Sequence, residues 1–168
     1  GGSIPPDEIM ELSKVVAESG KVVSIHLRNE GRKLLSSVVE AVNIARSTGA
    51  SVQISHFKAI GRKAWEDLGK TLRVIEKARK DEQLSVWLDF FPYLRTGSLL
   101  YTLLPDWVRE GGKDQIIALL SDASRKSEVI ESIRSLTLHY QNMIIAEAQK
   151  DKKSVGKSIA RIALEAEL

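Results

Sequence analysis

The chain has 168 residues, 43% hydrophobic and 28% charged, which is typical of one globular domain, and its lack of cysteine excludes disulfides, thiolate metal sites and a cysteine nucleophile. The net charge is +3, but basic and acidic residues are interleaved, so we expect solvated helix faces and no nucleic-acid partner. No apolar run approaches the roughly 18 residues of a membrane span and no secretory leader is present, so we expect no membrane contact and a cytoplasmic protein.

Helical and extended patterns alternate in the first part of the chain. Gly1-Gly2-Ser3 resembles a linker or a cleavage scar, and we expect a single domain over residues 4–168. Apolar residues at helical spacing predict helices over residues 5–19, 32–47 and 64–80. Short β-branched runs predict buried strands over residues 22–27, 51–56 and 84–90.

The alternation is looser beyond Tyr93. Short helices are predicted over residues 98–104, 113–120 and 127–135, and a fourth strand over residues 142–146. A final helix is predicted to begin at Ser154, as its capping residue, and to reach about Leu168. Strands that alternate with helices of this length favour an α/β fold with parallel βα units, either doubly wound or part of a TIM-like (β/α) barrel. In both arrangements the chemistry lies at the carboxyl ends of the strands.

Two histidines occupy equivalent places at that edge. His26 ends the first predicted strand and His56 ends the second. Neighbouring strands are about 4.8 Å apart, so two such imidazoles can converge on one metal ion or one reacting group. His139 lies in a region without a clear pattern, and we interpret it as structural.

Other polar residues follow the same strands. Arg28 and Glu30 follow the first, Lys58 the second, and Asp89 with Tyr93 the third. The alternative is ordinary loop chemistry, in which Arg28 and Glu30 pair with each other or cap the next helix. The roles of Glu30 and Asp89 stay open at this point.

Five segments resemble the N-acyl-D-amino-acid deacylases of the amidohydrolase superfamily. Residues 25–31 resemble the family's "H-x-R-x-E" segment, and residues 53–58 resemble its "Q-I-S-H-x-K" segment. Further similar segments are residues 89–93 ("D-x-Y-P-Y"), 103–107 ("L-L-P-x-W") and 156–159 ("G-K-S-[IL]"). They occur in the family's order and span nearly the whole chain. The resemblance implies a metal-bearing β/α barrel, of which this chain is an incomplete central part.

The resemblance also implies a chemistry for individual residues. In the family, a zinc-bound hydroxide attacks the amide carbonyl of an N-acyl-D-amino acid. His26 and His56 match positions that ligate zinc, and Lys58 matches a residue near the substrate carboxylate. Arg28 and Tyr93 complete the expected substrate-binding residues.

The resemblance begins partway through the family's barrel, so its other metal ligands and its general-base aspartate are expected to be missing. Phe91 also stands where the family more often has tyrosine. We therefore expect no catalytic residue within this chain, weak or no zinc binding, and no activity of the chain in isolation.

Two other interpretations remain. The chain could be a non-catalytic, self-associating barrel remnant, or part of a cyclic-amide hydrolase of the dihydroorotase or hydantoinase kind. In a partial barrel, inward apolar side chains would lack an opposite wall, and we expect a homodimer or larger assembly to cover them. The side chains expected to form this bare wall are those of Val22, Ile25, Val52, Ile54, Val86 and Leu88.

Overall fold

The computed structural model describes residues 4–135 and 138–167 of the chain. The chain forms two compact units, and the boundary between them falls between residues 136 and 137. Two compact units can belong to one folding domain, so the single domain expected over residues 4–168 stays a prediction. The tripeptide at residues 1–3 lies outside the described residues. No helix within the described ranges is both long and apolar enough to cross a membrane.

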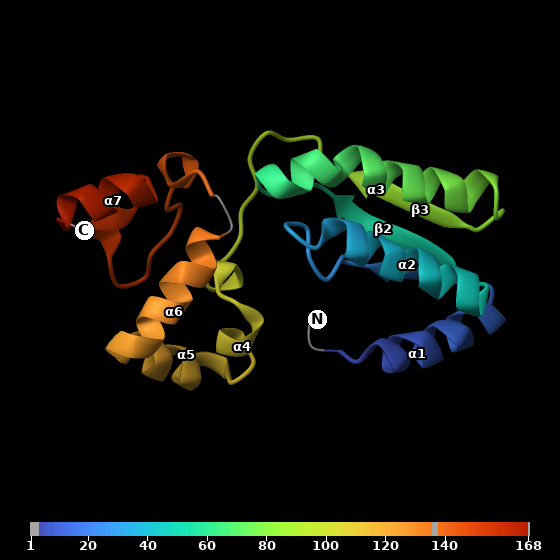
Figure 1. Ribbon diagram of the computed structural model, residues 1–168, viewed down its shortest axis with the longest axis horizontal. Helices are drawn as coiled ribbons and strands as arrows, with labels where there is room; N and C mark the ends of the chain where they lie inside the picture. Colours follow the sequence, from blue (N-terminus) through green and yellow to red (C-terminus); the bar gives the residue numbers. More distant parts are fainter. Residues whose placement is uncertain (1–3, 136–137, 168) are drawn as a thin grey trace. The chain divides into compact units, whose positions relative to one another are not determined.

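A three-stranded parallel sheet organises the first unit (Figure 1). Its strands are β1 (Val22–Ile25), β2 (Ser51–Phe57) and β3 (Val86–Phe90), in the order β1-β2-β3. Helix α2 (Leu34–Thr48) connects β1 to β2, and α3 (Arg62–Lys80) connects β2 to β3. Parallel neighbours need such crossovers, because a tight hairpin can only join antiparallel strands. The predicted α/β class with three parallel strands is confirmed.

Local sequence signals explain where the first helices begin and end. Helix α1 (Pro6–Glu18) starts with proline at its first position, where the missing N–H is not needed, and has acidic residues in its first turn. Helix α2 ends at Gly49, whose φ of 72° is a left-handed conformation that glycine adopts without a Cβ clash. The helices predicted over residues 5–19, 32–47 and 64–80 are confirmed to within two residues at each end.

The core lies between one face of the sheet and helices α2 and α3. Val52, Ile54 and Val86 are fully buried there and pack in one cluster with α2 and α3 residues such as Val38 and Ala78. Hydrophobic burial of this kind contributes about 1.5–3 kcal/mol for each large side chain.

The expectation of a bare apolar wall is wrong. Ile25 and Leu88 also pack against this core cluster, so the strand residues expected to lack an opposite wall are covered by the chain's own helices. Val22 is the exception, because it is 58% exposed and alternates with the core-facing Val23. The other face of the sheet carries the polar residues Ser24, Gln53, Ser55 and Asp89, together with the exposed side chains of Val22 and Trp87.

Short helices follow the sheet in the first unit. They are the 3₁₀ helix η1 (Leu100–Leu103) and the α-helices α4 (Asp106–Arg109), α5 (Gly112–Ser121) and α6 (Ala123–Arg134). The predictions over residues 98–104, 113–120 and 127–135 correspond to η1, α5 and α6, whereas α4 was not predicted. Helix α6 begins earlier than predicted because Asp122 caps it, accepting a hydrogen bond from the Arg125 N–H.

The second unit corrects two predictions. It holds 3₁₀ helices η2 (Tyr140–Asn142) and η3 (Lys152–Ser154) and helix α7 (Ile159–Glu165). The strand predicted over residues 142–146 is wrong, since this segment makes only an isolated antiparallel bridge, between Ile144 and Ser158. The helix start predicted at Ser154 is also wrong. Gly156 has a φ of 82°, which interrupts a helix, and Ser158 is the residue that caps α7; Leu168 lies outside the described residues.

Candidate functional site

Two imidazole rings meet at the carboxyl edge of the sheet. His26 follows β1 directly, His56 is the penultimate residue of β2, and the two strands are paired with Ile25 opposite Ile54. The rings are stacked with centroids 4.5 Å apart and planes at 23°, and Nδ1 of His26 is in hydrogen-bonding contact with Nε2 of His56. The structure therefore brings together the two histidines that the sequence places at equivalent strand ends.

A β-bulge determines where the His56 side chain points. Ile54 lies opposite Leu88 and Phe57 opposite Phe90, so β2 has one more residue than β3 between these two pairs. Simple alternation would turn His56 toward the helices, like Ile54. Instead Phe57 is buried and His56, with a φ of 42°, lies on the polar side. A positive φ is unfavourable for a residue with a Cβ, so neighbouring contacts must stabilise it.

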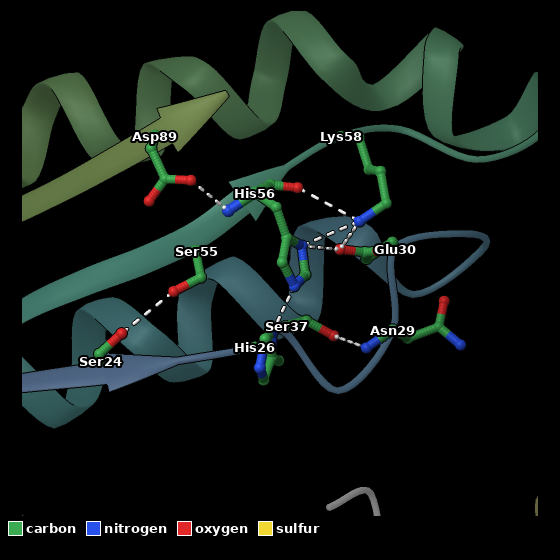
Figure 2. A network of polar contacts seen from close by, with 9 residues as sticks. All are labelled: Ser24, His26, Asn29, Glu30, Ser37, Ser55, His56, Lys58 and Asp89. Atoms are coloured by element: carbon green, nitrogen blue, oxygen red, sulfur yellow. Dashed lines mark hydrogen bonds and ion pairs between the residues drawn. The ribbon is translucent and has the colours of Figure 1, made fainter. Parts of the chain in front are cut away.

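Asp89 of β3 supplies such contacts (Figure 2). Its Oδ1 accepts a hydrogen bond of 2.6 Å from the His56 backbone N–H, and its Oδ2 accepts one of 2.8 Å from Nε2 of Gln53. The hydrogen bond from the His56 N–H, and to a smaller extent the one from Gln53, lowers the pKa of the Asp89 carboxyl below its ordinary value. Asp89, whose role the sequence left open, thus fixes the backbone of His56.

Glu30 and Lys58 contact Nδ1 of His56, the ring nitrogen that does not face His26 (Figure 2). Nδ1 of His56 is 3.0 Å from Oε1 of Glu30 and 2.9 Å from Nζ of Lys58. Lys58 Nζ also donates to Glu30 Oε1 at 2.6 Å and to the His56 carbonyl at 3.2 Å. The side chains of Lys58 and Glu30 are 18% and 16% exposed, so solvent screens this ion pair less than a surface pair.

A hollow of about 260 Å³ opens beside these side chains. Its lining residues are Glu30, His56, Lys58, Ile60, Phe91, Thr96, Gly97 and Ser98. Lys58 Nζ lies 5.8 Å from the centroid of the Phe91 ring. The hollow therefore combines an ammonium group paired with a carboxylate, an imidazole and an aromatic ring, so it offers both polar and apolar contacts to a small ligand.

Two other predicted site residues lie elsewhere. Arg28 forms an ion pair with Glu40 of α2, in which Nε of Arg28 lies 2.9 Å from both carboxylate oxygens. The alternative in which Arg28 pairs with Glu30 is therefore wrong, because Glu30 pairs with Lys58. Tyr93 is 71% exposed and packs edge-on against Phe91, with ring centroids 5.3 Å apart. Neither Arg28 nor Tyr93 is among the residues that line the hollow.

Some residues of this region were not singled out from the sequence. Ser24 and Ser55 are hydrogen bonded across β1 and β2 at 3.0 Å, and residues 96–98 contribute to the hollow. The alternation of polar with apolar residues in both strands was a usable signal for Ser24, Gln53 and Ser55. Residues 96–98 carry no periodic signal, and they reach the hollow only through the tertiary fold.

The donor set fits part of a zinc site. Two imidazole nitrogens face each other, and imidazole is a common zinc ligand. They are in direct contact, so a metal ion held by both would require the rings to move apart. Within residues 4–135 and 138–167, no group of three or more histidine, aspartate or glutamate side chains is arranged to hold a metal ion. Further ligands would have to come from outside this pair.

Comparisons with known proteins bear on this site. No family model matches the chain. It is 32% identical over 100 residues to an N-acyl-D-glutamate deacylase of Alcaligenes xylosoxydans xylosoxydans, and 30% identical over 94 residues to a D-aminoacylase of the same organism. The first match covers 60% of this chain and 20% of the relative, and the second covers 56% and 19%. The chain thus spans about a fifth of the length of these relatives.

The fold comparison extends over almost the whole chain. An N-acyl-D-glutamate deacylase from Bordetella bronchiseptica, solved with zinc and a phosphonate inhibitor that mimics the tetrahedral intermediate, matches with a TM-score of 0.68. The match covers 98% of this chain and 28% of that enzyme, at 22% identity. The chain fits a fragment of the N-acyl-D-amino-acid deacylase family. The resemblance found in its sequence motifs is confirmed, and zinc is present in a solved deacylase of that fold.

Proposed function

We propose that this chain is a segment of a metal-dependent hydrolase that cleaves the amide bond of N-acyl-D-amino acids. The observation that carries the proposal is the contact between Nδ1 of His26 and Nε2 of His56 at the ends of adjacent parallel strands. The similar proteins support the substrate class, since they are named N-acyl-D-glutamate deacylase and D-aminoacylase. They do not favour a cyclic-amide hydrolase.

We further propose that the sheet is part of a TIM-like barrel. Helices cover one face of it, and the uncovered face carries Ser24, Gln53, Ser55 and Asp89. In a β/α barrel, helices surround the strands and the opposite face of each strand points into the barrel, with the active site at the carboxyl ends. The position of His26 and His56 agrees with that arrangement.

The proposed roles follow from the chemistry of each side chain. His26 and His56 would supply two nitrogen ligands to zinc, which polarises an amide carbonyl and activates water when bound. Lys58 would attract the carboxylate of the substrate from the edge of the hollow. Because Nζ of Lys58 already contacts Glu30, a bound carboxylate would share the ammonium group with it. Arg28 and Tyr93 stay predicted substrate-binding residues.

We also propose that these 168 residues alone do not catalyse the reaction. A catalytic zinc usually has three protein ligands, and the described residues offer no group of three. Incubation of the zinc-supplemented chain with N-acetyl-D-glutamate, followed by assay of free D-glutamate, should therefore show no release above a protein-free blank. Release that depends on His26 and His56 would contradict this part of the proposal.

Self-association remains a proposal on different grounds. The apolar wall that motivated it is covered by helices, but β1 and β3 each have one neighbour in the described sheet and so leave their outer edges unpaired. Unpaired edges are templates for pairing with another chain. A homodimer or larger assembly is therefore still expected, and light scattering after size exclusion measures it. The cytoplasmic location likewise stays a prediction.

The metal-ligand roles are tested by zinc titration of the purified chain. With two ligands from the chain we expect only weak zinc binding by the wild type, and its loss in the double variant His26→Ala, His56→Ala. His139→Ala is the matched control, because it removes the third histidine of the chain without touching the pair. Equal zinc binding by all three proteins would contradict the proposal.

A further inference from the structure

We infer that Glu30 is a positioning residue for His56, which holds the imidazole in the tautomer that leaves Nε2 free as a ligand. The inference rests on the proposed metal-ligand role of His56 and adds to it a function for Glu30 and for its ion pair with Lys58. The groups involved are the Glu30 carboxylate, the Lys58 ammonium group and the two ring nitrogens of His56.

The place of Glu30 is fixed by its backbone. Its carbonyl accepts a hydrogen bond of 2.8 Å from the N–H of Ile60, which joins the loop after β1 to the loop after β2. The side chain of the preceding residue, Asn29, accepts hydrogen bonds from the N–H groups of Gly31 at 2.9 Å and Lys33 at 3.0 Å. These contacts fix the backbone at Glu30, from which its side chain reaches His56.

The contacts of Nδ1 of His56 favour one protonation pattern. A carboxylate oxygen 3.0 Å from Nδ1 is attractive only if that nitrogen carries a proton, because two lone pairs would otherwise face each other. Lys58 Nζ is also 2.9 Å from Nδ1, but its N–H groups already have oxygen acceptors in Glu30 Oε1 at 2.6 Å and the His56 carbonyl at 3.2 Å, so Lys58 does not need Nδ1 as an acceptor. The geometry therefore places the proton on Nδ1, donated to Glu30.

This tautomer has a direct consequence at the opposite side of the ring. With the proton on Nδ1, Nε2 of His56 has a lone pair, and Nε2 is the atom that contacts His26. A histidine that ligates metal commonly donates its other N–H to a carboxylate, which fixes the ring and raises its basicity. Lys58 completes the arrangement by balancing the charge of Glu30.

The tautomer of His56 can be read directly from two-bond ¹H–¹⁵N correlation spectra of the metal-free chain at one alkaline pH. In the wild type we expect Nδ1–H on His56, with the signals assigned by single replacement of each histidine. Glu30→Ala should shift His56 toward Nε2–H, the form that free histidine favours. Glu30→Gln should retain part of the Nδ1–H form, because its amide oxygen can still accept the hydrogen bond.

Two further variants keep the test informative. Glu82→Gln is the matched control, since it neutralises a carboxylate that pairs with Arg46, and His56 should be unchanged. Glu30→Ala combined with Lys58→Met avoids an unbalanced ammonium group and should give the same shift as Glu30→Ala if the carboxylate is responsible. Nε2–H on His56 in the wild type, or Nδ1–H retained when Glu30 is alanine, would overturn the inference.

The zinc affinity of the same variants links this inference to the proposed function. Loss of such a carboxylate partner typically lowers metal affinity about 10- to 100-fold. We expect Glu30→Ala to fall in that range and Glu82→Gln to match the wild type. Because the tautomer is measured without metal, a protein with the expected tautomer but no zinc binding would contradict the proposed function and not the role of Glu30.

Discussion

The two sides of the parallel sheet differ in what their residues do. On the helix side, Val52, Ile54 and Val86 are fully buried in one continuous core. On the other side, hydrogen bonds join Ser24 to Ser55, and they join Asp89 to Gln53 and to the backbone N–H of His56. The pleat of the strands, in which neighbouring residues point to opposite faces, thus separates the buried core residues from the hydrogen-bonded polar residues.

The largest expected effect is on the helix side. Ile54→Ala should lower the free energy of unfolding by about 2–5 kcal/mol, because it removes a fully buried side chain and leaves a cavity. Val22→Ala on the other side should change it by less than about 0.5 kcal/mol, because Val22 is 58% exposed. Chemical denaturation measures both. Similar losses from the two substitutions would break the comparison between the sides.

A smaller effect is expected from the polar side. Removal of the hydrogen bond between Ser24 and Ser55 by Ser24→Ala should cost about 0.5–1 kcal/mol of unfolding free energy. In a double-mutant cycle, Ser55→Ala should then cost less in the Ser24→Ala background than in the wild type. Fully additive losses would show that the two hydroxyl groups do not interact.

The pH dependence should separate Asp89 from the core. Hydrogen bonds from His56 and Gln53 lower the pKa of Asp89, so its stabilisation is present above the ordinary aspartate pKa of about 3.9 and is lost as the pH falls through the folded-state value. Asp89→Asn should therefore flatten the decline of unfolding free energy below about pH 4. An unchanged acid profile in this variant would contradict the described contacts of Asp89.

The sequence predicted the helix side well because the signals there are local. Apolar spacing, Pro6 at a helix start and Gly49 at a helix end predict the helices, and burial of the regularly spaced apolar residues stabilises them. The direction of the strand side chains was predicted less well. The expected bare wall includes Val52 and Ile54, which the helices of the chain cover, and this depends on which face the crossovers occupy.

The structure brings together several of the residues that the sequence singled out, but their contacts were not predicted. The position of His26 and His56 at the ends of neighbouring strands predicted that they would lie close together. The bulged backbone at His56 was not predicted, because the residue that hydrogen bonds to it, Asp89, is 33 residues away in the sequence. The pairing of Arg28 with Glu40 is another tertiary contact that spacing did not indicate. In the second unit, the left-handed Gly156 and the bridge between Ile144 and Ser158 replaced the predicted strand and the early helix start.

The central claim is that the polar side of the sheet carries a pair of metal-ligating histidines. X-ray absorption at the zinc edge of the zinc-loaded chain tests it most directly. The account predicts two imidazole nitrogens at about 2.0–2.1 Å from zinc in the wild type, and their loss when His26 and His56 are replaced by alanine. A spectrum without imidazole ligands, or one that the double substitution leaves unchanged, would contradict it.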